Sequence, residues 1–326
     1  MKKNIVKYIK GIIIIFTIYL LLFLELPFYI KRGGGIIDIS ERIEIENANI
    51  INGSYNMAYV SELKATIPIY LIALMNKNWD IEKKEEIIIE NEKNAELRGE
   101  IALKEANDTA ILVAYKKALK NIKINNTKLI VTYIDENAKT DLQIGDTILE
   151  VNDFVIKDKN NFNDIIKNLE IGSKINIKVE NNDKIYNRTA TIVDIDGNKK
   201  IGIVIYNNYD LEINPEIKFN FKKSESGASG GLMMSLAIYD YLTKKDISKG
   251  RKIAGTGTID IDGNIGEIDG VEYKIIGAYK NGADIFFVPA GSNYKDALKT
   301  MNNNNLDIEL VPVKTFDDAL KYLTKE

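Results

Sequence analysis

The pentapeptide Gly227-Ala-Ser-Gly-Gly231 surrounds Ser229 with glycine and runs directly into apolar residues at helical spacing that continue to Leu242. Glycines on both sides permit a tight turn and a close approach of the backbone. A serine where a helix begins faces unpaired N–H groups and the positive end of the helix dipole, and such groups can hold an oxyanion. The segment therefore predicts a serine nucleophile at the start of a helix. A serine that only caps the helix is the alternative.

The composition removes the usual proton acceptor for such a serine, because the chain of 326 residues contains no histidine and no cysteine. The G-x-S-x-G pattern is typical of α/β-hydrolases, in which the serine gives its proton to an imidazole. Thiol nucleophiles and metal sites made of histidine or cysteine are excluded as well, so we expect neither a metal nor a cofactor. The base for Ser229 must be a lysine, a carboxylate or a terminal amine.

One lysine downstream is well placed for this role. Lys274 lies in the segment Gly270–Gly282, and at about 100° per residue it shares a helical face with Val271, Ile275 and Ala278. A lysine on an apolar face loses its hydration, which disfavours the charged form and lowers its pKa toward neutrality, as a general base requires. The alternative is a lysine that extends its amine to solvent from a surface helix.

The first 30 residues predict a membrane anchor. A basic head at 1–10 precedes an apolar run at 11–30, which at about twenty residues is long enough to span a bilayer. A cleavable signal peptide is the alternative, but no small-residue cleavage site follows the run. The head carries more lysine than Lys31 and Arg32 supply after the run. We therefore expect a single-pass protein of the cell membrane, with a cytoplasmic N-terminus and an extracytoplasmic body.

The rest of the chain is long enough for about two domains of roughly 150 residues each. Alternating apolar residues predict a strand at 36–46 with a partner at 55–63, and helical spacing predicts helices at 66–76 and 92–121. The net charge of −3 argues against a nucleic-acid partner.

Two similar segments, Asp194-Ile-Asp-Gly-Asn198 and Asp260-Ile-Asp-Gly-Asn264, carry aspartate at alternating positions. Both lack the glycine spacing and the ligand count of an EF-hand calcium loop. Because Asp-Gly between β-type residues is typical of a tight hairpin, we predict a hairpin turn at each segment.

Residues 127–197 resemble a PDZ domain. The stretch Leu142-Gln-Ile-Gly-Asp-Thr-Ile-Leu-Glu-Val-Asn152 is followed by a short helix pattern near 163–169 and by an alternating strand at 174–179. The resemblance implies that an extended peptide binds as an added strand beside the helix. The glycine loop with which the family holds a terminal carboxylate is missing from 121–127. Strict capture of C-termini is therefore not expected.

Three motifs in register resemble the proteolytic domain of Lon-type Ser-Lys proteases. They are Ser226-Gly-Ala-Ser-Gly-Gly-Leu232, Ala254-Gly-Thr-Gly-Thr-Ile-Asp-Ile-Asp-Gly-Asn-Ile-Gly-Glu-Ile268, and Gly270-Val-Glu-Tyr-Lys274 with its continuation to Pro289. The resemblance implies that Ser229 is the nucleophile, that Lys274 is the general base and that Thr256 orients the lysine. The loop residues that would support them are Gly227, Ala228 and Gly230.

The sequence departs from this family at two positions of the loop. Ala228 stands where the family usually has proline, and Ser226 stands where it has an acidic residue or glycine. Ser224 and Ser226 are the other hydroxyls in the loop that could act in place of Ser229. We expect the backbone N–H groups around Ala228 and Ser229 to hold the oxyanion.

The whole chain resembles the membrane-anchored PDZ–Lon (S16-type) Ser-Lys proteases of Gram-positive bacteria. The resemblance implies an α+β fold in which one transmembrane helix precedes a Lon-type proteolytic domain with an inserted PDZ domain. The expected divisions are a head at 1–10, an anchor at 11–30, the protease domain at 36–124 and 198–326, and the PDZ domain at 125–197. Independent tandem domains are the alternative.

These observations predict a serine endopeptidase that acts outside the cytoplasm. The chain has no G-x-x-x-x-G-K-[ST] loop, so we expect no ATP and substrates that are peptides or unfolded proteins, selected by the PDZ domain. Association of several copies stays open. A non-catalytic membrane-anchored PDZ adaptor is the first alternative. A signal-peptidase-like enzyme is the second, and it would carry its lysine on a strand.

Overall fold

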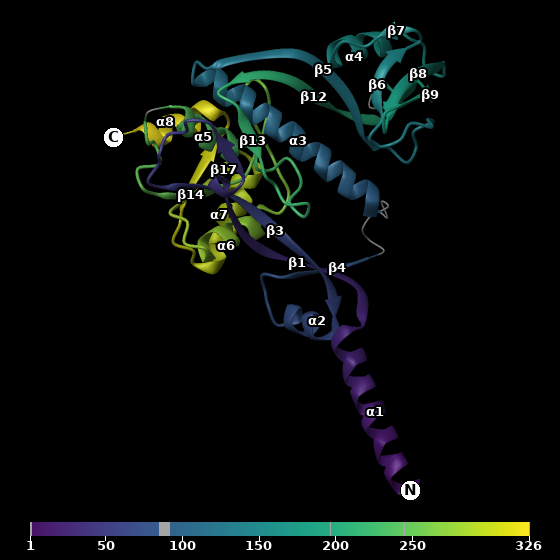
Figure 1. Ribbon diagram of the computed structural model, residues 1–326, viewed down its shortest axis with the longest axis vertical. Coiled ribbons are helices and arrows are strands. Elements are labelled where there is room, and N and C mark those ends of the chain that lie inside the picture. Colours follow the sequence, from purple (N-terminus) through teal and green to yellow (C-terminus); the bar gives the residue numbers. More distant parts are fainter. Residues whose placement is uncertain (1, 85–91, 196, 244, 326) are drawn as a thin grey trace.

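The computed structural model describes residues 2–84, 92–195, 197–243 and 245–325. Its first element is helix α1 (Lys2–Phe23), which projects away from the body of the protein (Figure 1). The chain then enters strand β1 (Glu25–Asp38), whose residues Tyr29 and Ile30 pair with Lys64 and Leu63. The helix ends before Pro27, which disfavours helical backbone at Leu26.

The structure therefore does not support a transmembrane anchor over residues 11–30, because residues 25–30 belong to the sheet. Among the residues that the structure describes, no helix combines the length and the apolar character that crossing a membrane requires.

The body is built on a six-stranded sheet in the order β18-β17-β14-β3-β1-β4. β1 and β3 are antiparallel, which confirms the predicted partnership of these two segments. β14 runs parallel to both β3 and β17, and β17 runs parallel to β18. The further strands are β3 (Ser54–Thr66), β4 (Asp80–Lys83), β14 (Lys252–Gly255), β17 (Ile285–Pro289) and β18 (Glu309–Val313).

Helices cover both faces of this sheet. Successive residues of the fully buried β17 show the two faces: Phe287 belongs to a core with α3, α5 and α8, and Phe286 to a core with α6 and α7. Because both faces of such a parallel strand are buried, its sequence is a continuous run of apolar residues. The helices are α3 (Glu92–Lys117), α5 (Gly231–Leu242), α6 (Val271–Lys280), α7 (Ser292–Asn304) and α8 (Phe316–Thr324).

Two of the predicted segments differ in detail. The strand expected at 36–46 is broken after Asp38 by the short helix η1 (Ile39–Glu41), and β2 (Ile43–Ile45) then pairs with β13 (Ile217–Phe219). The helix expected at 92–121 ends at Lys117, because Leu119 takes a left-handed conformation and the chain turns into β5. The helix expected at 66–76 is α2 (Ile67–Leu74).

A second lobe has its own sheet, in the order β12-β5-β6-β8-β9, and its own apolar core between Leu129 and Ile205. Two long antiparallel strands, β5 and β12, join this lobe to the body (Figure 1). The predicted domain boundaries at 125 and 197 fall inside or beside this ladder and stay predictions. The elements are β5 (Asn121–Ile134), β6 (Thr147–Val151), β7 (Phe154–Val155), α4 (Lys159–Lys167), β8 (Lys174–Asn181), β9 (Lys184–Thr191) and β12 (Ile203–Asn214).

Both predicted hairpin turns are confirmed. β10 (Val193–Ile195) pairs antiparallel with β11 (Asn198–Lys200), although Asp196 itself lies outside the described residues. β15 (Thr258–Ile259) pairs antiparallel with β16 (Ile265–Gly266) around the second Asp-Gly segment.

Candidate active site

Ser229 lies on the loop immediately before α5, as the sequence predicts. Gly227 has a φ of 93°, a left-handed value that side chains with a Cβ rarely adopt, so glycine is needed there. The loop is held from two sides: Gly227 donates its N–H to the carbonyl of Gly99 in α3 at 3.0 Å, and the N–H of Gly257 donates to the carbonyl of Ser229 at 2.8 Å. The serine is therefore on a fixed turn between two elements.

Lys274 lies in the first turn of α6, directly after Gly270 in left-handed conformation. The lysine is only 5% exposed and has Val271, Ile275 and Ala278 as buried neighbours on its helix. The prediction of a lysine on the buried face is confirmed. Burial is the main reason why the pKa of this amine falls to about 8, although the nearby carboxylates of Asp269 and Glu272 pull it upward.

Thr256 connects the two residues. Lys274 Nζ donates to Thr256 Oγ1 at 3.3 Å, and Thr256 Oγ1 donates to the carbonyl oxygen of Ser229 at 3.1 Å. Thr256 is fully buried. One hydroxyl therefore fixes the position of the lysine relative to the backbone of the serine.

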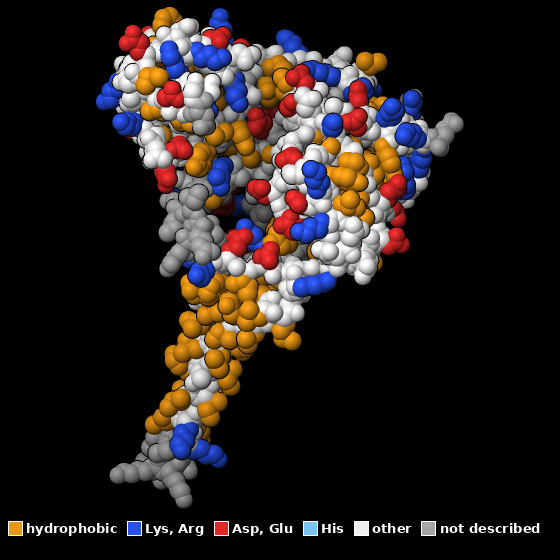
Figure 2. Space-filling model, turned by 180° about the vertical axis from the view of Figure 1, so that it is seen from behind, with side chains coloured by type: hydrophobic (Ala, Val, Ile, Leu, Met, Phe, Trp, Pro, Cys, Tyr) orange, Lys and Arg blue, Asp and Glu red, His pale blue; other side chains and the backbone are white. Residues whose placement is uncertain are grey.

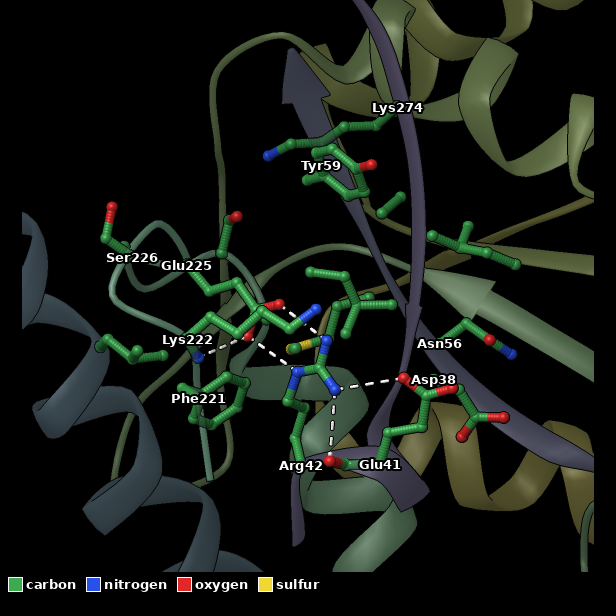
Figure 3. A pocket seen from close by; sticks show the side chains of 18 of the residues that line it. Asp38, Glu41, Arg42, Asn56, Tyr59, Phe221, Lys222, Glu225, Ser226 and Lys274 are labelled. Atoms are coloured by element: carbon green, nitrogen blue, oxygen red, sulfur yellow. Dashed lines mark hydrogen bonds and ion pairs between the residues drawn. The ribbon is translucent and has the colours of Figure 1, made fainter. Parts of the chain in front are cut away.

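Ser229 and Lys274 both line an open cavity of about 780 Å³. Lys274 extends past Tyr59 toward the loop that carries Glu225 and Ser226 (Figure 3). The other walls come from β1, β3, η1 and the segment 221–230. Ser229 and Lys274 therefore face one shared cavity. If they lay on separate surfaces with bulk solvent between them, no proton could pass directly from the serine to the lysine.

Backbone donors also point to chemistry at this loop. Within the described part of the chain, the N–H groups of Ala228 and Ser229 have no hydrogen-bond acceptor. Such groups at a helix start suit a developing negative charge. Ala228 additionally lines a second cavity of about 430 Å³ between α3, β12 and the β15–β16 hairpin.

Sequence reasoning missed Arg42. Its guanidinium donates from Nε and Nη2 to the two carboxylate oxygens of Glu225, both at 2.8 Å (Figure 3). Partial burial opposes ionisation of Glu225, but these hydrogen bonds outweigh it and hold the pKa of the carboxyl below its usual value. Glu225 also accepts the backbone N–H of Lys222, so the pair braces the loop that leads to Ser229. Arg42 and Glu225 are 183 residues apart in the sequence, and no local sequence pattern predicts that they pair.

The other loop residues are divided between the two cavities. Ser224, Ser226, Gly227 and Gly230 line the larger one, so the alternative hydroxyls share that cavity with Lys274. Within the described residues, no group of three or more acidic side chains gathers as a metal site would require.

Residues 219–326 match the family model of the Lon protease (S16) C-terminal proteolytic domain, and residues 99–192 match that of the PDZ domain. One segment of the chain thus resembles the Lon-type proteolytic domain, and another resembles a PDZ domain. The PDZ match begins inside α3 and is longer than the predicted PDZ segment.

Among curated proteins, the Lon protease of Mesomycoplasma hyopneumoniae is 33% identical over 101 residues, which are 31% of this chain and 11% of that protein. The Lon protease of Campylobacter jejuni is 30% identical over 119 residues, which are 36% of this chain and 14% of that protein. The chain therefore spans 11% and 14% of the lengths of these two relatives. The solved PDZ domain of an SdrC-like protein from Listeria monocytogenes covers 26% of this chain and 92% of its own, at 23% identity and a TM-score of 0.24.

Proposed function

We propose that this chain is a serine endopeptidase that works without ATP, with Ser229 as nucleophile and Lys274 as general base. One observation carries the proposal: the buried amine of Lys274 lines the cavity of Ser229 and is tied through Thr256 to the serine backbone. A base must be neutral to accept a proton, and burial favours the neutral amine.

In the proposed reaction, Lys274 Nζ takes the proton of Ser229 Oγ while that oxygen attacks the carbonyl carbon of a peptide bond. The resulting oxyanion is held by the N–H groups of Ala228 and Ser229. Lys274 then gives its proton to the leaving amine, and the acyl group stays on Ser229. Water that is deprotonated by the same amine attacks this ester. Lys274 Nζ then returns the proton to Ser229 Oγ as the ester bond breaks, and the second product leaves.

The PDZ domain is proposed to hold an extended stretch of the substrate. β12 is an edge strand of its sheet, and an extended peptide can add to such an edge by backbone hydrogen bonds. The N–H groups of Asn207 and Tyr209 are already taken by the carboxylates of Glu105 and Asp108 in α3, at 3.1 and 3.3 Å. The edge open to a peptide is therefore the part of β12 before Asn207.

This arrangement supports peptides and unfolded proteins as the substrate class, because only a chain without tertiary structure can add to β12 and still reach Ser229. The proposal also includes attachment to a membrane through α1, with the catalytic body outside the cytoplasm. Its support is the exposure of apolar side chains along α1, where Ile12, Ile15 and Phe23 are 66%, 69% and 62% exposed. This part is tested by washing a membrane fraction that contains the protein. The protein should stay in the membrane fraction at high salt and be released by detergent.

The catalytic proposal is tested by reaction with a fluorophosphonate probe and by cleavage of an unfolded substrate in the absence of ATP. Ser229→Ala should abolish both the labelling and the cleavage. Ser226→Ala is the matched control, since this serine lines the same cavity, and it should keep both activities. Equal cleavage by the wild type and Ser229→Ala would contradict the role of Ser229, and the absence of labelling and cleavage in the wild type would favour a non-catalytic PDZ adaptor.

A further inference from the structure

We propose that helix α2 lies flat on a lipid bilayer, as a second membrane contact beside α1. The inference rests on the membrane attachment proposed above and is independent of the proposed proteolysis. It assigns a partner, the acyl surface of a lipid leaflet, to a helix that has no part in the catalytic site.

The first observation is an exposed apolar face on α2. Leu71, Ile72, Leu74 and Met75 are 55%, 52%, 62% and 88% exposed. Large apolar side chains that stand together on a surface indicate an interaction site, whereas scattered ones do not. Within the described residues, nothing in this chain covers them.

The opposite face of α2 is already used. Ile69, Tyr70 and Ala73 pack on the end of the sheet against Ile30 and Ala65. Because this face holds the helix firmly to the body, the exposed face keeps a fixed direction. The helix is apolar on both faces, and its outward face needs an apolar environment of its own.

The second observation is continuity with α1. α2 contacts α1, and it lies at the point where α1 joins the body (Figure 1). In the space-filling view the apolar surface of α1 continues without interruption onto the base of the body (Figure 2). Two apolar surfaces that meet at one end of the molecule can enter the same lipid phase together.

The length of α2 decides how it meets the lipid. Eight residues at about 1.5 Å per residue give roughly 12 Å, well short of the roughly 30 Å of a bilayer core. A short helix of this kind lies in the interface. The neighbouring aromatic residues lie on the inner side of α2: Tyr70 is tilted against Phe28, with ring centroids 5.0 Å apart, and Trp79 packs in the same cluster under the guanidinium of Arg32.

The chain offers one clean probe of this contact. It contains no cysteine, so Met75→Cys carries one environment-sensitive fluorophore at a defined position. Leu119→Cys is the matched control, because Leu119 is 92% exposed and follows the end of α3 that lies far from α1 (Figure 1).

The experiment reconstitutes the full chain with phosphatidylcholine vesicles whose acyl chains carry bromine, which quenches fluorescence on contact. The probe at position 75 should be quenched several-fold more than the probe at position 119. Leu71→Glu combined with Leu74→Glu should remove most of the quenching of the probe at position 75. The same double variant should cleave a short soluble peptide at the wild-type rate.

The possible failures are distinguishable. Equal quenching at positions 75 and 119, in protein that floats with the vesicles, overturns the inference for α2 alone. Protein that does not float overturns the membrane attachment of both helices and leaves the proteolysis to its own test. A disulfide that forms between two copies of Met75→Cys, and shields the probe without lipid, would assign this face to a second copy and overturn the lipid contact.

Discussion

The chemistry of Lys274 depends on the side chains around it more than on the lysine itself. Burial lowers its pKa from 10.5 to about 8, so the folded state disfavours the charged amine. For a base of this kind the stability of the fold decreases as the pH falls from 10.5 toward 8 and stays low below that range. At neutral pH this shift corresponds to about 3 kcal/mol of lost stability.

Replacement of Lys274 by methionine should therefore separate stability from activity. The variant should unfold at a higher denaturant concentration at pH 7, with a gain in unfolding free energy of up to about 3 kcal/mol that shrinks above pH 8. Its cleavage rate should fall by roughly 10²–10⁴-fold. Lys280→Met, at the exposed end of the same helix, should change neither quantity. A destabilised Lys274→Met protein would show that the amine is not held in its neutral form.

Thr256 is expected to act as a positioning residue. Thr256→Val removes the hydroxyl that joins Lys274 to the Ser229 carbonyl, and kcat should fall by about 10²-fold while KM stays close to the wild-type value. Thr256→Ser should restore most of the rate, because it restores the hydroxyl. Thr300→Val in α7 is the control of equal size. A failure of serine to rescue would reduce Thr256 to a packing role.

At the scale of the elements, the loop before α5 is held in place by an ion pair with a residue near the N-terminus of the chain. Arg42 and Glu225 form a bidentate pair whose side chains are 9% and 13% exposed. A double-mutant cycle with Arg42→Met and Glu225→Gln should give a coupling free energy of roughly 0.5–3 kcal/mol in unfolding, and each single variant should lower kcat. Lys223 on the same loop forms an exposed pair with Glu96 of α3, and Lys223→Ala should cost less than about 1 kcal/mol of unfolding free energy.

The edge of β12 is tied to α3 by two carboxylates. Burial raises the pKa of both Glu105 and Asp108, yet each accepts a backbone N–H from β12. The double variant Glu105→Ala and Asp108→Ala should lose amide-exchange protection at Asn207 and Tyr209, while amides that bond to β5 stay protected. Substrates that need the PDZ domain should then be cleaved more slowly, and short peptides should not. Unchanged exchange at both amides would refute this connection.

For the molecule as a whole, the β5–β12 ladder offers a place to remove the PDZ lobe. Thr127 and Tyr209 are directly paired, so an Asn-Gly turn between them would close a hairpin from the remaining halves of both strands. The shortened protein should fold and cleave short peptides near the wild-type rate, and it should lose its preference for long unfolded substrates. An equal loss for both substrate lengths would show that the lobe supports catalysis itself.

Contacts between residues that are close in the sequence could be predicted from it, and contacts between residues that are far apart in the sequence could not. The place of Ser229 before a helix and that of Lys274 on a buried helical face could be predicted, because glycine turns and helical spacing are local patterns. Arg42 and the α3 carboxylates could not, because their partners are 183 and about 100 residues away and their residue types are ordinary. The apolar run at 11–30 was misread at its end, where backbone pairing with β3 overrides hydropathy.

The most direct test of the Ser229–Lys274 pair is the rate of fluorophosphonate labelling as a function of pH, with the labelled residue identified by mass spectrometry. The account predicts that Ser229 alone is labelled, that the rate rises with pH through an apparent pKa near 8, and that the rise is absent in Lys274→Met. Labelling of Ser224 or Ser226, or a rate that rises unchanged in Lys274→Met, would contradict it.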